Sequence, residues 1–145
     1  MLKVVSKVTN SLKPYERNAR KHSDKQITKI ASSMAQFGCN NPILIDKSDT
    51  IIAGHGRWAA AKKLGMKEVP TICLEHLSPD EVRAYIIADN KLAELAGWDR
   101  DILAIELQHL STIDLDFDLE ITGFEAGEID YIIGGPVVQK LDPAD

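Results

Sequence analysis

A short segment, Gly54-His55-Gly56-Arg57, carries the most specific chemistry in this sequence. It follows an apolar, β-branched run at residues 50–53 and leads into helix-forming residues at 57–64. A strand that turns through glycines into a helix points several unpaired backbone N–H groups at one place, where an anion binds readily. Arg57 would add a planar guanidinium that grips a phosphate with two nitrogen atoms, and His55 would add a donor at the rim. We therefore predict a phosphate-binding loop.

A plainer interpretation of this segment competes with phosphate binding. The glycines could relieve strain in an ordinary strand-to-helix turn, with Arg57 only solvated. The segment matches neither the GxxxxGK[ST] loop nor a complete GxGxxG fingerprint. Phosphate binding would gain support from other polar residues that reach the same anion, and we predict this role for Asn18, Arg20, Asn90 and Lys91. Their alternative is an exposed polar surface, although asparagine inside a helix, as predicted for Asn90, usually needs a partner for its amide.

Other chemistry has little support in the residue spacing. We expect no metal site, because no ligand spacing joins the four histidines to one another or to carboxylates: His22, His55, His76 and His109. No GxSxG, Cys–His or paired-carboxylate motif stands out, so we assign no catalytic residue.

The composition describes about one globular domain. The chain has 145 residues, of which 44% are hydrophobic and 27% charged. No apolar run approaches the roughly 20 residues that cross a bilayer, and the first residues lack a signal-peptide pattern, so we expect no membrane contact. Cys39 and Cys73 lie far apart and outside any CxxC pattern, which argues against a disulfide framework and for a reducing cytoplasm.

The formal net charge of -5 conceals a division along the chain. Residues 1–76 contain 13 Lys and Arg against 6 Asp and Glu, whereas residues 77–145 contain 4 against 16. A basic surface collects phosphate-bearing ligands and an acidic surface repels them, so we predict contact with DNA or a nucleotide in the first half. The alternative is that both halves are only solvated surface.

Strands and helices are interspersed through the first part of the chain. The sequence predicts strands at residues 4–8, 42–46, 50–53 and 69–74. The second and third of these strands should form a β-hairpin. Pro70 would place the last of these strands at a sheet edge or near a strand start. Helical spacing predicts helices at 24–37, 57–64 and 79–93. Capping-box pairs open the first and last of these helices: Ser23 with Gln26, and Ser78 with Glu81.

The remaining residues predict a helical extension. Asp99 can cap a helix that continues through Leu110. Residues 113–119 alternate between apolar and acidic, which suits either a strand or an irregular segment. A short helix at 127–133 would end at Gly134-Gly135-Pro136. We therefore expect three regions: a domain at 1–95, a helical extension at 96–133, and a linker at 134–145 toward a downstream domain.

Several of these motifs occur in an order that resembles a known family. The motifs Asn18-Ala19-Arg20, Pro42–Ile45, Ile52–Ala61 and Ala88–Lys91 together resemble the ParB-like N-terminal domain of the ParB/sulfiredoxin superfamily, over roughly residues 3–95. The resemblance implies an α+β fold: a compact mixed α/β domain with a small sheet flanked by helices, followed here by the helical extension.

The resemblance also implies site residues. In the chromosome-partition members a GxxRxxA stretch binds the phosphates of CTP, and Gly54, Arg57 and Ala60 match it. Two further family motifs are matched by Asn18 with Arg20, and by Asn90. Partition members carry Glu-Arg where this chain has His55-Gly56, and an arginine soon after the Asn90 position, so we expect weak or absent CTP hydrolysis. Sulfiredoxins place their reactive cysteine where His55 stands, which excludes that chemistry.

The end of the chain resembles the stretch that joins a ParB-like domain to a methyltransferase domain in DNA modification methylases. The catalytic tetrapeptide and cofactor glycine motif of a methyltransferase are missing, and we expect no helix-turn-helix domain after residue 95. We therefore expect a DNA-associated binding or regulatory domain rather than an enzyme, with DNA and a downstream methyltransferase domain as partners. No cofactor is assigned. The alternatives are a CTP- or NTP-binding switch that uses Mg²⁺, and a ParB-like nuclease.

Overall fold

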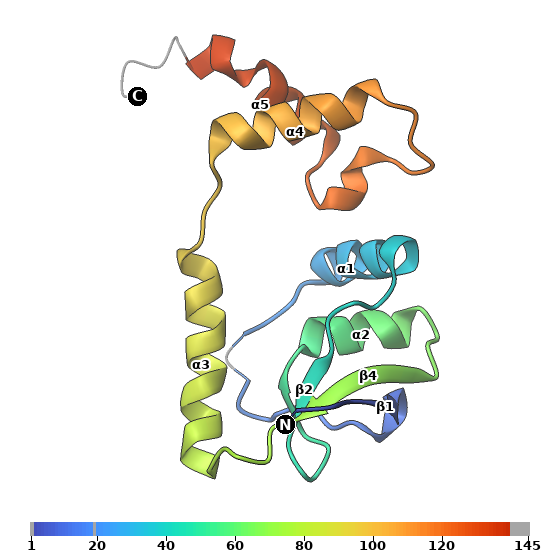
Figure 1. Ribbon diagram of the computed structural model, residues 1–145, viewed down its shortest axis with the longest axis vertical. Helices are drawn as coiled ribbons and strands as arrows, with labels where there is room; N and C mark the ends of the chain where they lie inside the picture. Colours follow the sequence, from blue (N-terminus) through green and yellow to red (C-terminus); the bar gives the residue numbers. More distant parts are fainter. Residues whose placement is uncertain (1, 19, 140–145) are drawn as a thin grey trace. The chain divides into compact units, whose positions relative to one another are not determined.

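The computed structural model describes residues 2–18 and 20–139 of the chain. The chain divides into two compact units, Met1–Ala96 and Gly97–Asp145. The first contains a four-stranded sheet in the order β1-β4-β2-β3 (Figure 1). Strand β4 runs antiparallel to β1 and parallel to β2, and β2 and β3 form the predicted antiparallel hairpin. The bounds of the strands are β1 Val4–Val8, β2 Ile43–Ile45, β3 Ile51–Ala53 and β4 Glu68–Cys73.

The turn of the hairpin is held by one aspartate. The carboxylate oxygen Oδ1 of Asp46 accepts the backbone N–H groups of Ser48 at 2.8 Å and of Thr50 at 2.9 Å. Asp49 adopts a positive φ of 64°, which aspartate tolerates better than most residues. The polar turn Lys47–Asp49 therefore reverses the chain between two buried apolar strands.

Strand β4 lies inside the sheet, so of the two predicted positions of Pro70 the sheet edge was wrong, whereas the position near a strand start is confirmed. β4 pairs with β1 on one side, where Pro70 lies opposite Ser6. On the other side β2 pairs with β4 only from Thr71 onward. Proline lacks the N–H that a ladder needs, and it is tolerated here because only one neighbouring strand reaches its position.

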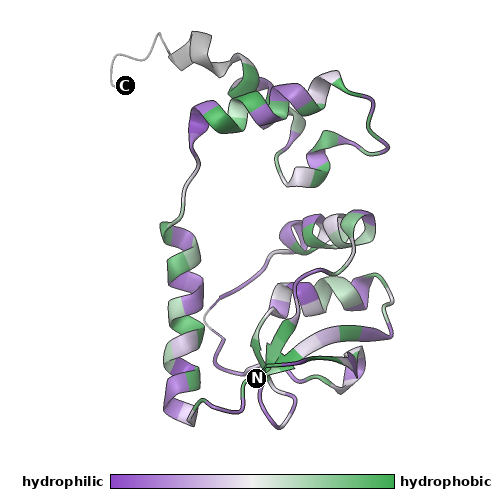
Figure 2. Ribbon diagram, in the orientation of Figure 1, coloured by the Kyte–Doolittle hydropathy of each residue, from purple (hydrophilic) through white to green (hydrophobic). Residues whose placement is uncertain are grey.

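Helices cover both faces of this sheet. On one face, α1 (Asp24–Phe37) and α2 (His55–Lys63) pack on a core that includes Ile43, Ile45 and Ile51. On the opposite face, α3 (Pro79–Leu95) packs over Ile52. Successive residues of a strand point to opposite faces, which explains why neighbours such as Ile51 and Ile52 enter different clusters. Strand β2 is green in Figure 2, whereas the polar residues of β4 interrupt its green with paler bands. The predicted α+β fold is confirmed.

The helix boundaries follow the predicted caps with two corrections. At α3 the full capping box forms, with Ser78 Oγ accepting from Glu81 N and Glu81 Oε1 accepting from Ser78 N. At α1, Ser23 Oγ accepts from Gln26 N, but the Gln26 side chain turns to His22 instead of closing a capping box. Helix α2 begins at His55, two residues earlier than predicted.

The second unit pairs two helices. Helix α4 (Arg100–Thr112) is capped by Asp99, as predicted, and its Leu107 is buried, as are Ile129 and Ile132 of α5 (Ala126–Gln139). Acidic side chains hold the start of α5, where Glu120 accepts the N–H of Ala126 and Glu128 accepts that of Glu125. Negative charge at a helix N-terminus is favourable, so part of the acidity of this unit is structural.

Two predictions for this unit are corrected. Residues 113–119 contain no strand; they are irregular up to a short 3₁₀ helix, Leu119–Thr122, which is the other alternative left open by the sequence. Helix α5 does not stop at Gly134-Gly135-Pro136 but continues to Gln139, because a proline weakens a helix without always ending it. Of the expected linker, residues 140–145 lie outside the described residues. Among the described helices, none has the length and apolar character needed to span a membrane.

The capping box of α3 makes a stability prediction. Ser78→Ala removes the acceptor for Glu81 N, so we expect the free energy of unfolding to fall by about 1 kcal/mol. Urea unfolding measures this change, with Ser32→Ala on the exposed surface of α1 as the control. Equal unfolding midpoints for Ser78→Ala and the native chain would contradict it.

Candidate functional site

A small concavity of about 150 Å³ forms where the 15–22 loop, the start of α2 and α3 meet. Seven of the nine predicted site residues line it: Asn18, Arg20, Gly54, His55, Gly56, Arg57 and Asn90. Asp89 and His22, which the sequence analysis did not select, also line it. The structure therefore brings the glycine segment together with two segments that lie more than thirty positions away along the chain.

The glycines serve packing more than ligand access. Gly54 is the N-cap of α2, with a φ of 105°, and a Cβ atom there would lie 2.9 Å from Arg57 Nη2. Gly56 is buried, and a Cβ there would lie 3.0 Å from Ile30 Cδ1 and 3.1 Å from His22 Cε1. The predicted glycine loop is thus the first turn of a helix pressed against α1. The space around both glycines is filled by protein atoms.

Arg57 is half-buried and only partly satisfied. Its Nη2 donates to the carbonyl oxygen of Pro42 at 2.9 Å. Its Nε is buried and has no hydrogen-bond partner within the described part of the chain. Burial lowers the pKa of Arg57, and this effect is opposed by the nearby Cys39 and Asp89. A bound anion at the concavity would compensate this half-buried positive charge.

His55 acts as an acceptor, whereas the sequence suggested a donor. The backbone N–H of Tyr15 donates to His55 Nε2 at 3.0 Å, which requires that nitrogen to be unprotonated. Burial lowers the pKa of His55, and the neighbouring His22 lowers it further. This hydrogen bond fixes the start of the 15–22 loop to the first turn of α2.

The remaining polar residues already have protein partners. Arg20 Nη1 lies 3.6 Å from Glu94 Oε2, and the Arg20 N–H donates to Asn18 Oδ1 at 3.3 Å. Asn90 Nδ2 donates to the carbonyl of Ile86 at 2.8 Å, one turn back in its own helix. Part of the hydrogen-bonding capacity of Asn90 is therefore used inside α3, as is common for polar side chains that bond back to a helix.

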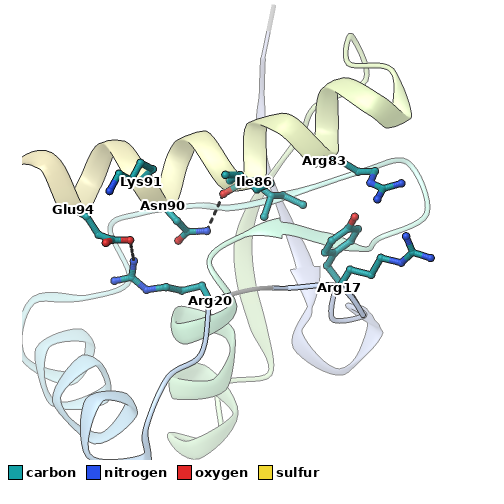
Figure 3. A pocket seen from close by; sticks show the side chains of 9 residues that line it. Arg17, Arg20, Arg83, Ile86, Asn90, Lys91 and Glu94 are labelled. Atoms are coloured by element: carbon teal, nitrogen blue, oxygen red, sulfur yellow. Dashed lines mark hydrogen bonds and ion pairs between the residues drawn. The ribbon is translucent and has the colours of Figure 1, made fainter.

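Two predicted site residues do not line the concavity. Ala60 is fully buried in the core between α1, α2 and the sheet. Lys91 lines a neighbouring cleft of about 320 Å³ (Figure 3). This cleft adds Arg17 and Arg83, which the sequence analysis did not propose as site residues. The i, i+4, i+8 spacing of Arg83, Ile87 and Lys91 is the signal that could have found it.

Comparison with known proteins gives two family matches. Residues 3–90 match the family described as ParB N-terminal domain, and residues 101–145 match the ParB-methyltransferase HTH domain. The ParB-like nuclease domain-containing protein YnaK of Escherichia coli K12 is 46% identical over 80 residues, which cover 55% of this chain and 92% of that protein. A probable chromosome-partitioning protein ParB of Rickettsia bellii is 35% identical over 80 residues, or 54% of this chain. The aligned residues span 28% of the length of that relative.

Solved structures show the same fold. The C-terminally truncated chromosome-partitioning protein ParB from Caulobacter crescentus, complexed with CTP-γ-S, matches with a TM-score of 0.76 at 18% identity. That match covers 98% of this chain and 88% of the other. The same partitioning protein complexed to the centromeric parS site matches with a TM-score of 0.52 at 21% identity, over 90% of this chain and 64% of the other.

The match to an HTH family overturns the expectation that no such domain follows residue 95. The acidic composition obscured it, since residues 97–145 contain 2 Lys and Arg against 12 Asp and Glu. Basic residues that meet DNA phosphates are the usual sign of a DNA-reading helix, and α5 contains neither Lys nor Arg. The sequence therefore predicted an acidic helical extension where residues 101–145 match an HTH family.

The hydrogen bond between Tyr15 and His55 predicts a pH dependence. Because the pKa of folded His55 lies below its ordinary 6.5, the unfolded chain takes up a proton first as the pH falls. The contribution of neutral His55 to the free energy of unfolding is therefore complete above about pH 6.5 and is lost as the pH falls below that value. We expect the free energy of unfolding, measured with urea at pH 7.5 and at pH 5.5, to fall less in His55→Gln than in the native chain. The glutamine keeps an acceptor but does not titrate. The exposed His76, changed to Gln, is the control. If both variants lose as much stability as the native chain, the assignment to His55 is incorrect.

Proposed function

Because this chain belongs to the ParB N-terminal domain family, we propose that its first unit binds phosphate groups of DNA as a regulatory part of a DNA modification methylase. One observation carries the phosphate assignment: Arg57 lies half-buried in the wall of the concavity, and among the described residues no carboxylate forms an ion pair with it. A guanidinium in that state favours an anionic ligand over a neutral one. The match of residues 101–145 to an HTH domain of ParB-methyltransferases supports the methylase assignment.

The size of the concavity favours a phosphate group over a complete nucleotide as its occupant. Its volume of about 150 Å³ is below the range of roughly 300 to 1,000 Å³ typical of small-molecule pockets. Arg20 and Arg57 supply positive charge, and Asp89 is a carboxylate that opposes it. We expect moderate affinity that depends on salt, because the contact is mainly electrostatic.

Arg57→Gln tests the phosphate contact. The change removes the positive charge and keeps a polar side chain of smaller size, so we expect duplex DNA at low salt to bind about tenfold more weakly. The slope of log affinity against log salt should fall by about 0.9. Fluorescence anisotropy measures both quantities. Lys63→Gln, on the exposed end of α2, makes the same charge change away from the concavity and serves as the control.

Three results of this experiment would contradict the proposal. They are no binding by the native chain, binding without salt dependence, and equal weakening in Arg57→Gln and Lys63→Gln. Circular dichroism melting curves of both variants establish that a loss of binding is not a loss of the fold.

A CTP-binding switch is the second candidate, favoured by the structural likeness to a ParB complexed with CTP-γ-S. Asn18, Arg20 and Asn90, which match two further motifs of the family, line the concavity together with Arg57. His55 is held as a neutral acceptor and Gly56 has no side chain, so neither position supplies charge to a triphosphate. We therefore expect CTP hydrolysis with Mg²⁺ at the level of a protein-free blank. Calorimetric CTP binding together with phosphate release well above that blank would make the switch the better assignment.

Nuclease activity is a third candidate, because the similar Escherichia coli protein YnaK is described as containing a ParB-like nuclease domain. Metal-assisted phosphodiester cleavage usually relies on several carboxylates around a divalent ion. Among the described residues that line the concavity, Asp89 is the single carboxylate. We therefore place phosphate binding ahead of cleavage.

A further inference from the structure

A second hollow adjoins the phosphate concavity on the same unit. It has a volume of about 320 Å³ and shares Arg20 and Asn90 with the concavity in its wall. Figure 3 shows Arg17 and Arg83 at one end of this cleft, Arg20 and Glu94 toward the other, and Ile86 between them. The two hollows thus lie next to each other, with Arg20 and Asn90 in the wall of both.

The far end of the cleft carries uncompensated positive charge. Arg20 has Glu94 as an ionic partner, at 3.6 Å. Within residues 2–18 and 20–139, no ion pair joins Arg17 or Arg83 to a carboxylate. Two arginines that face the same hollow repel each other, and this arrangement is stabilised when an anion lies between them.

The wall of the cleft between its charged ends is apolar. Tyr15 and Ile86 line it together with Ile87, whose side chain is 65% exposed. The backbone of Tyr15 is fixed by its hydrogen bond to His55, so this part of the wall is ordered before a ligand arrives. A cationic groove beside an aromatic or apolar platform is the general arrangement that binds unpaired bases and their phosphates.

We infer that the two hollows together bind a single strand of nucleic acid. One phosphate occupies the concavity at Arg57, a neighbouring phosphate lies between Arg17 and Arg83, and a base rests against Tyr15 and Ile87. This inference rests on the proposed phosphate-binding function and extends it by a substrate class.

The distribution of charge favours a strand over the two other nucleic-acid ligands. A mononucleotide carries all its phosphates at one end, so it would leave either Arg57 or the pair Arg17 and Arg83 without an anion. A duplex keeps its bases stacked and paired inside, so it cannot place a base on the apolar wall without unpairing it. A single strand presents both phosphates and an unpaired base.

The double variant Arg17→Ala/Arg83→Ala tests the inference on the full chain. The probes are fluorescein-labelled dT12, a 12-base-pair duplex, and dTMP as competitor. We expect dT12 to bind about tenfold more weakly, with a salt slope lower by about 0.7 for the lost phosphate contact. Affinities for the duplex and dTMP should change less than twofold. Lys63→Ala/Lys67→Ala, at two exposed positions outside the cleft, makes the same change in net charge and should leave dT12 binding intact.

The apolar wall has a separate test that leaves charge unchanged. Ile87→Ser should weaken dT12 binding several-fold with an unchanged salt slope. Leu92→Ser, an equally exposed position of α3 outside the cleft, is the control and should have no effect. Equal effects of these two serine variants would overturn the role of the platform.

The outcomes separate the inference from the proposed function. If dT12 and duplex both bind and both depend on Arg57, but dT12 binding is insensitive to Arg17 and Arg83, only the single-strand inference fails. It also fails if duplex or dTMP weakens as much as dT12 does, or if the Lys63/Lys67 control loses equal affinity. If neither nucleic acid binds the native chain, the proposed function itself fails.

Discussion

The hydrogen bond from Arg57 to the carbonyl of Pro42 holds the arrangement on which the rest of the site depends. It ties the first turn of α2 to the residue that precedes β2, and it needs Gly54, because a Cβ there would meet the guanidinium. The bond satisfies only part of Arg57, so a charged group stays half-buried with one free donor. The residue that anchors the helix thus carries a half-buried positive charge, which an anion at the concavity would compensate.

A second contact extends this constraint to the neighbouring loop. The Tyr15 N–H meets His55 in the first turn of α2, so the loop that carries Arg17 and Arg20 begins at a fixed point. Across the loop, α3 presents Arg83, Asn90 and Lys91. Cations from three separate segments therefore gather on one unit, while the other unit is strongly acidic. Electrostatics favours anionic ligands on the first unit and disfavours them on the second.

Local patterns were sufficient for most elements of the first unit. Val4–Val8 and Asp24–Phe37 match their predicted bounds, because alternation and capping act within a few residues. Errors arose where a distant segment decides the outcome. Pro70 is tolerated inside the sheet because β2, which is parallel to β4, begins only opposite Thr71, and the Gln26 side chain bonds to His22. In the second unit, acidic composition concealed the similarity of residues 101–145 to an HTH domain, since charge describes a surface and not the packing of two helices.

The sequence by itself determined the family, the α+β fold class and the basic character of the first half, because motifs, periodicity and charge are local properties of the chain. It also identified most of the residues that meet at the concavity. Only the tertiary structure decided their roles: Gly56 makes room for Ile30, His55 accepts a hydrogen bond, and Ala60 fills the core. It also revealed Arg83 opposite Arg17. These roles depend on which distant atoms fill the space around a side chain, and spacing along the chain does not contain that information.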